Sequence, residues 1–187
     1  GTAQMDQIIF SDTAEEGDRV VAAIDLNGRV HPSCSFNWDS VTMKSAEEVR
    51  AQIRVMEDLG KEHLVTAGKD ISNPGVIGTL GMLLEVSGKG AVIDLEAIPR
   101  PDLSAIGLPF EQWVRMYPGM GFILTVKEEN VHEVCRRFTD VGIAAAPIGE
   151  VDGSRRLSVR YLGRETQVFD LDHNGIMQIF IEGEACR

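Results

Sequence analysis

One glycine-rich stretch, KDISNPGVIGTLG, holds the residues of this sequence that are best suited to chemistry. It contains a single acid, Asp70, and then three glycines, Gly75, Gly78 and Gly81, within seven positions of an expected helix. Each glycine inside a helix costs about 0.5–1 kcal/mol relative to alanine. So many glycines in one helix indicate a backbone that something must approach closely.

The start of this helix suits an anion. A helix N-terminus carries about half a positive charge and several unpaired N–H groups. Residues 74–79 contain no Asp or Glu to offset that charge, so a phosphate is the anion we expect. Pro74 suits a first helical position, which makes Asn73 the expected N-cap. The predicted phosphate- or nucleotide-binding residues are Ser72, Asn73, Gly75, Gly78 and Thr79.

Asp70 would repel a bare phosphate, but a Mg²⁺ ion between them reverses the sign, because Mg²⁺ binds carboxylate and phosphate oxygens together. Asp70 is therefore the predicted metal ligand, and no catalytic residue is assigned. A second interpretation stays open, in which the glycines only allow close packing of the helix and Asp70 caps a turn. The stretch matches neither GxxxxGK[ST] nor GxGxxG.

The surrounding sequence predicts a layered α/β (α+β) domain with a mixed sheet covered by helices. We expect strands at residues 18–28, 91–98, 121–126 and 143–151, and an irregular segment at 30–42. A helix begins at the capping box of Ser45 and Glu48, with Val49, Ile53 and Met56 as its periodic apolar residues, and stops at Gly60. Further helices are expected from residue 74 to about 86, at 109–117 and at 130–142, then a hairpin about residues 163–164 and a last helical turn in residues 174–187.

Composition excludes several classes of protein. The chain of 187 residues has a net charge of −11, which argues against a nucleic-acid surface. No apolar run approaches the ~18 residues of a membrane span, and we expect neither a membrane partner nor a signal peptide. Cys34, Cys135 and Cys186 are expected to be reduced thiols of a cytoplasmic protein, and the four histidines show no metal-ligand spacing.

Three segments in this order are familiar: KDISNPGVIGTLGMLLEVSGKGAVIDLEAIP, YPGMGFILTVKEENVHEVCRRFTDVG and IAAAPIGEV. Together they resemble the C-terminal domain of the aminoimidazole ribonucleotide (AIR) synthase, or PurM-like, superfamily. The similarity covers residues 17–153 and is nearest the AIR synthase-related proteins of the methanogenesis-marker type. It implies that residues 1–187 form one C-terminal domain. The ATP-binding N-terminal domain that pairs with its twin in a homodimer would be absent from this chain.

The resemblance implies ATP-dependent phosphoryl transfer to, or activation of, a small-molecule substrate, with Mg²⁺ as cofactor. Asp70 matches the aspartate that opens the family motif D-[IV]-[ST], a Mg²⁺ ligand in the thiamine-monophosphate kinase type, and Ser72 matches a position that touches ATP there. Asn73 stands where that kinase has a second metal-binding aspartate. The segment YPGMGFILTV lacks the acids of the kinase, so thiamine phosphate is not the expected substrate.

Two functions are therefore carried forward. In the first, the chain is the C-terminal domain of an ATP-dependent phosphotransferase or ligase-type enzyme, and this domain by itself is expected to be inactive. In the second, it is a non-catalytic ligand-binding or assembly module that keeps the fold, as the amide at Asn73 suggests.

Overall fold

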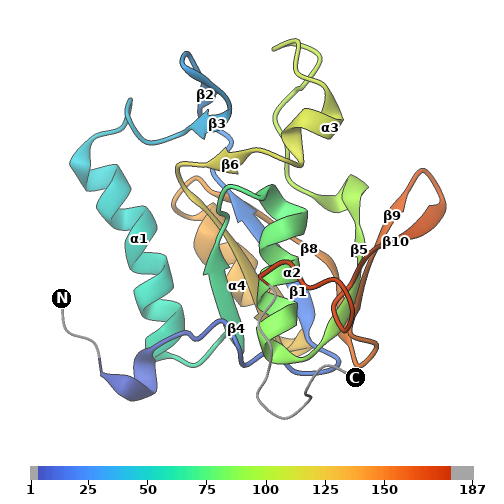
Figure 1. The fold of residues 1–187 in the computed structure, drawn as a ribbon. Helices are drawn as coiled ribbons and strands as arrows, with labels where there is room; N and C mark the ends of the chain where they lie inside the picture. The colour runs from blue at the N-terminus through green and yellow to red at the C-terminus, as the bar shows by residue number, and fades with distance from the viewer. Residues whose placement is uncertain (1–3, 178–187) are drawn as a thin grey trace.

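The structure is a computed structural model and describes residues 4–177. Its centre is a seven-stranded mixed sheet in the order β10-β9-β5-β8-β1-β7-β4, in which β5 and β9 are parallel and the other pairs antiparallel (Figure 1). This confirms the expected layered α/β class. The strands are β1 (Arg19–Ile24), β4 (Ala67–Asp70), β5 (Gly90–Asp94), β7 (Gly121–Val126), β8 (Ala144–Asp152), β9 (Arg156–Tyr161) and β10 (Arg164–Asp170).

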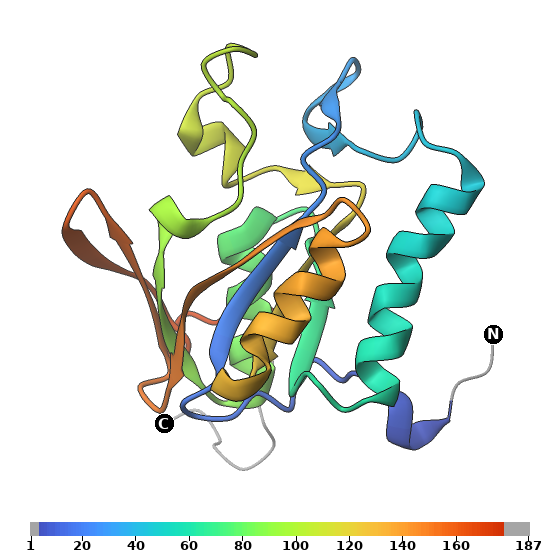
Figure 2. The same cartoon turned by 180° about the vertical axis from the view of Figure 1, so that it is seen from behind.

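Helices cover both faces of this sheet. Helix α2 (Gly75–Ser87) lies on one face, and α1 (Ala46–Lys61) and α4 (Val131–Thr139) lie on the other, as the two opposite views show (Figures 1 and 2). The sheet separates two hydrophobic cores, and β1 contributes to both, because successive side chains of a strand point to opposite faces. Its Val20 and Ile24 join the core under α2, whereas Val21 joins the core under α1 and α4.

The remaining elements are short. They include the 3₁₀ turns η1 (Met5–Gln7), η2 (Leu95–Ala97) and η3 (Glu128–Asn130), and the small helix α3 (Phe110–Trp113). A second sheet, in the order β2-β3-β6, is formed by β2 (Arg29–His31), β3 (Cys34–Asp39) and β6 (Tyr117–Pro118). Among residues 4–177 no helix combines the length and the apolar character that crossing a membrane requires.

Several boundaries differ from the sequence expectations. Residues 30–42 are not irregular, because β2 and β3 pair there and Trp38 is buried with its indole N–H donating to the Asp25 carbonyl at 3.0 Å. β1 ends at Ile24, β5 gives way to a 3₁₀ turn after Asp94, and the turn of the last hairpin is Leu162–Gly163. Most of the expected last helical turn lies outside the described residues.

The capping box of α1 is confirmed, since the Ser45 side chain accepts from the Glu48 N–H while the Glu48 side chain accepts from the Ser45 N–H. The prediction of which face of α1 is buried is partly wrong, because Ile53 is 53% exposed and Gln52 is buried. Gln52 takes the inner position because its amide donates to the buried carboxylate of Asp25 at 2.8 Å. Because of this one hydrogen bond, the buried face of α1 includes Gln52 in place of Ile53, which the spacing of apolar residues had predicted to be buried.

Glu133 on α4 should give the protein an acid-dependent stability. Its carboxylate accepts from Arg136 and Arg137, at 2.7 Å each, and these hydrogen bonds lower the pKa of Glu133 from an ordinary 4.5 to about 2. Stability from a lowered pKa is present above pH 4.5 and is lost as the pH falls through about 2.

We expect Glu133→Gln to lower the melting temperature at about pH 6, and we expect the difference from the wild type to shrink steadily below about pH 4.5. Thermal melts followed by circular dichroism would measure it, with the exposed neighbour Glu129→Gln as control. A difference that does not change with pH would contradict the assignment.

Candidate functional site

Asp70 is the last residue of β4, which is an edge strand of the large sheet. It lies opposite Phe122 of β7 in the antiparallel register, and its side chain is 70% exposed. The Lys69 ammonium lies 3.7 Å from the Asp70 carboxylate. The structure therefore presents this carboxylate to solvent rather than burying it in an ion pair.

Ser72 connects Asp70 to the following helix. Its hydroxyl donates to the Asp70 carboxylate at 2.9 Å, and its backbone N–H donates to the Thr79 hydroxyl at 3.0 Å. Thr79 is completely buried in α2. Thr79 thus holds the turn from inside, while Ser72 orients the carboxylate from outside.

Asn73 and Pro74 are both exposed, and the helix begins one residue later than expected. Pro74, not Asn73, is the N-cap, and no side chain caps the helix. The physical reason is that Gly75 has a positive φ of 70° and its N–H donates to the Ser72 carbonyl at 2.9 Å, so residues 72–75 form a turn before the helix. The first turn of α2 contains no acidic residue, as the sequence indicated.

Gly75 is buried against the segment that leads from α3 into β6. A Cβ at Gly75 would lie 2.6 Å from the Val114 carbonyl oxygen and 2.7 Å from the Arg115 backbone. The N–H of Val76 donates to that same Val114 carbonyl at 3.2 Å. The N–H groups of Gly75 and Val76, at the start of α2, therefore both donate to backbone carbonyls of this chain.

Gly78 and Gly81 are also buried, and both allow close packing. A Cβ at Gly78 would overlap the ring of Pro74, and one at Gly81 would overlap the side chain of Ile176. The structure therefore gives all three glycines a packing role, which is the second interpretation that the sequence left open. Of the predicted site residues, Asp70 and Asn73 are exposed and Ser72 is half-buried, whereas Gly75, Gly78 and Thr79 lie beneath them.

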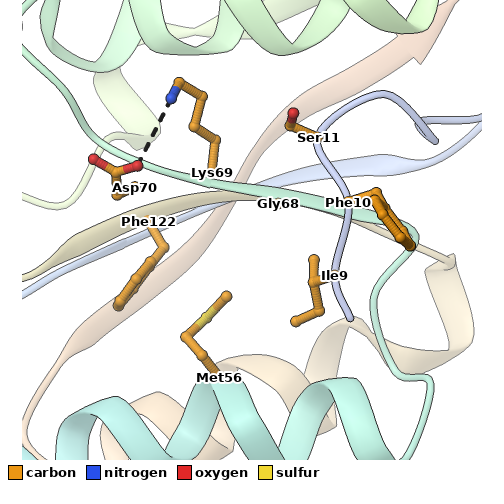
Figure 3. Close-up of a pocket in the computed structure, with 8 residues that line it drawn as sticks. All are labelled: Ile9, Phe10, Ser11, Met56, Gly68, Lys69, Asp70 and Phe122. Atoms are coloured by element: carbon orange, nitrogen blue, oxygen red, sulfur yellow. Dashed lines mark ion pairs between the residues drawn. The ribbon is translucent and has the colours of Figure 1, made fainter. Parts of the chain in front are cut away.

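A groove of about 500 Å³ runs beside β4 and reaches Asp70 (Figure 3). Met56, Phe122 and Ile9 lie on one side of the strand, and Lys69 extends from the other side toward Asp70. The groove was not predicted from the sequence, because β4 was not predicted. A four-residue strand with one buried side chain, Ala67, carries almost no hydrophobic period.

The residues around Asp70 fit a magnesium ion in part. Asp70, Ser72 and Asn73 offer carboxylate, hydroxyl and amide oxygens, the hard donors that Mg²⁺ prefers, and Mg²⁺ commonly takes only one or two carboxylates together with phosphates and water. Among residues 4–177 no three His, Cys, Asp or Glu side chains gather into a metal site. Cys34 and Cys135 are free thiols, as expected, and Cys186 lies outside the described residues.

Comparison with known proteins places the chain in a family. A sequence profile described as "AIR synthase related protein, C-terminal domain" matches residues 14–162. An uncharacterised protein of Methanocaldococcus jannaschii is 43% identical over 172 residues, covering 92% of this chain and 52% of that protein. An uncharacterised protein of Synechocystis is 36% identical and covers 89% of this chain and 51% of its own length. The chain thus spans about half the length of these relatives.

The fold has solved counterparts. Phosphoribosylformylglycinamidine synthase II of Thermotoga maritima superposes with a TM-score of 0.74 at 16% identity, over 99% of this chain and 30% of that one. A structure of the same Thermotoga protein complexed with ATP gives a TM-score of 0.71 at 16% identity, over 99% and 30% of the two chains. Family profile, relatives and fold agree, and this chain belongs to the AIR synthase-related proteins, whose C-terminal domain it carries over residues 14–162.

Proposed function

We propose that this chain is the C-terminal domain of an ATP-dependent enzyme, in which it helps to bind the phosphates of Mg-ATP and a small-molecule substrate. The reaction is phosphoryl transfer to that substrate or its activation by ATP. The observation that carries the proposal is the Asp70 carboxylate, exposed at the end of β4 and held by the Ser72 hydroxyl at 2.9 Å. Family membership and the ATP complex of the Thermotoga protein support the choice of nucleotide.

In this proposal the Asp70 carboxylate would hold the Mg²⁺ ion, and the exposed side chain of Asn73 would contact a phosphate. The magnesium ion, when bound, neutralises phosphate charge, which together with positioning is most of what phosphoryl transfer requires from a protein. Ser72 holds the carboxylate, and Thr79 holds Ser72 from within the helix. Gly75 and Gly78 contribute indirectly, by letting the turn at 72–75 sit close to its neighbours.

The other parts of the enzyme belong to the proposal as well. This chain matches only about half of each relative, and the other half has room for a separate ATP-binding domain, which supports a nucleotide site that this chain forms only in part. We place the protein in the cytoplasm as a homodimer, and we expect the isolated domain to be inactive.

Calorimetric titration of Mg-ATP into the full-length natural protein tests the proposal. We expect Asp70→Ala to weaken Mg-ATP binding about tenfold or more, because the phosphates lose a metal-bridged partner. Asp58→Ala removes another exposed acid, near the C-terminal end of α1, and should leave the affinity unchanged. Equal affinity of wild type and Asp70→Ala would contradict the proposed role.

The second candidate is a non-catalytic module that binds a ligand or assembles a complex. Asn73 favours it, because an amide carries no charge and is a weaker metal ligand than an aspartate. The N–H groups of Gly75 and Val76 also favour the non-catalytic module, because they donate to backbone carbonyls of this chain and are not directed at a ligand. Mg-ATP that binds without being consumed in the presence of any acceptor would support this candidate.

A further inference from the structure

We propose that Arg115 binds a carboxylate group of the small-molecule substrate, beside the turn at residues 72–75. The inference deepens the proposed function and rests on it, since it takes the substrate to bind next to the Asp70 site. It names the substrate as a carboxylic acid and Arg115 as the residue that recognises it. Arg115 lies between α3 and β6, at the end of the large sheet where β4 ends and α2 begins (Figure 1).

The Arg115 side chain is positioned by an aromatic ring. Its guanidinium carbon lies 4.9 Å from the centre of the Phe36 ring, over the face of that ring. Phe36 comes from β3 and packs against the hydrophobic core under α2, which fixes the ring. A guanidinium is attracted to the face of an aromatic ring. The planar group is therefore held in place before a ligand binds.

The side-chain N–H groups of Arg115 are available to a ligand. The residue is exposed, and among residues 4–177 no carboxylate pairs with its guanidinium and no oxygen accepts a hydrogen bond from it. Arg100 provides the contrast. Its guanidinium carbon lies 5.4 Å from the centre of the Phe110 ring, but its Nη1 donates to the Glu96 carbonyl at 2.7 Å. Both arginines lie over a phenylalanine ring, and Arg115 keeps its donors for another molecule.

The segments around Arg115 contain no acidic residue. Residues 26–38 contribute β3, which pairs with β6, residues 112–127 include Arg115 itself, and residues 71–84 contain Gly75, which lies against the Arg115 backbone. None of the 29 Asp and Glu residues of the chain falls in these three segments. An anion at Arg115 therefore meets little local repulsion, although the net charge of the chain is −11.

The turn at residues 72–75 connects Arg115 with the proposed metal site. A Cβ at Gly75 would lie 2.7 Å from the Arg115 Cα, so the turn and the Arg115 backbone are in direct contact. At the other end of the turn, the Ser72 hydroxyl donates to the Asp70 carboxylate at 2.9 Å. A substrate bound at Arg115 would thus be held by the same turn that orients Asp70. Catalysis by positioning requires the two reacting molecules to be held next to each other in this way.

The available donors favour a carboxylate over a phosphate. The planar guanidinium can bind two oxygens of either anion in a bidentate manner. A phosphate has a further charged oxygen, and the N–H groups at the start of a helix are the usual donors for it. The N–H groups of Gly75 and Val76 already donate to the Ser72 and Val114 carbonyls. A single guanidinium without those N–H groups therefore matches the two oxygens of a carboxylate.

NMR titration of the full-length natural protein with malonate tests the inference, and malonamide is the matched neutral compound. We expect malonate to shift the Arg115 Nε–H signal in a saturable way and malonamide to leave it unchanged. Arg115→Gln and Arg115→Lys should each weaken malonate binding, measured from the line broadening of malonate, about tenfold or more. Lysine keeps the charge but lacks the planar pair of donors. Arg100→Gln is the control and should leave malonate binding unchanged.

Three results would refute the carboxylate site. They are a malonate titration without a saturable shift at Arg115, malonate binding that survives Arg115→Gln or Arg115→Lys at full strength, and inorganic phosphate that binds at Arg115 more tightly than malonate. Each of them concerns only the anion at Arg115 and leaves the metal site at Asp70 untouched.

Two variants separate this inference from the proposed function. Arg115→Gln should not change the calorimetric affinity for Mg-ATP, and Asp70→Ala should not change the affinity for malonate. If Arg115→Gln loses malonate binding while Asp70→Ala binds Mg-ATP normally, the carboxylate site stands and the metal site is refuted. If Asp70→Ala loses Mg-ATP binding while malonate binding does not depend on Arg115, the metal site stands and the carboxylate site is refuted.

Discussion

Lys44→Met is expected to lower the free energy of unfolding by about 3–5 kcal/mol, because it leaves the carboxylate of Asp25 buried without its cation. Asp25 is completely buried, and its carboxylate lies 2.6 Å from the Lys44 ammonium, whose own side chain is 9% exposed. The same ammonium donates to the Ser40 carbonyl at 3.0 Å. A methionine side chain would fill a similar volume. It could neither neutralise the Asp25 carboxylate nor donate a hydrogen bond to the Ser40 carbonyl.

Urea unfolding followed by tryptophan fluorescence measures this loss, since Trp38 donates to the Asp25 carbonyl and reports on the same region. Lys61→Met is the matched control. Its partner Glu57 is also 2.6 Å away, but both side chains are about half exposed, and exposed pairs contribute only about 0–1 kcal/mol. A loss below about 1 kcal/mol for Lys44→Met would mean that water reaches Asp25 in the folded protein.

The ion pair also shows which parts of the fold could be predicted from the sequence. The capping box at Ser45 and Glu48 depends on two residues three positions apart, and it was predicted correctly. The inward turn of Gln52 depends on Asp25, 27 residues earlier. Local patterns cannot report a contact of that kind, and the apolar period therefore placed Ile53 inside in error.

In the candidate site too, features that depend on neighbouring residues were predicted, and features that depend on distant residues were not. The sequence indicated Asp70 and the acid-free start of α2, because both are properties of a short stretch. It did not indicate the groove, because the groove is formed by residues 9–11, α1, β4 and β7, which meet only in the folded chain (Figure 3). It also left the purpose of the glycines open, because the atoms that crowd Gly75 belong to residues about 40 positions later.

Gly75→Ala should therefore be among the most damaging single-atom changes in the chain, with an expected loss of about 2–5 kcal/mol in the free energy of unfolding. Two costs combine. A non-glycine residue at a φ of 70° is strained by about 1–2 kcal/mol. The new methyl group would also lie 2.6 Å from the Val114 carbonyl oxygen, and overpacking of this kind costs about 1–3 kcal/mol.

Gly107→Ala separates the two costs, because Gly107 has a similar φ of 65° but no atom within 4 Å of an added Cβ. It should lose only the ~1–2 kcal/mol of backbone strain in the same urea titration. Equal losses at the two positions would show that the segment at Val114 yields and that the contact with α2 is loose. A larger loss at Gly75 would show that this contact holds the turn at 72–75. Because Gly75 donates its N–H to the Ser72 carbonyl, the same variant should then weaken Mg-ATP binding as well, through displacement of the serine that orients Asp70.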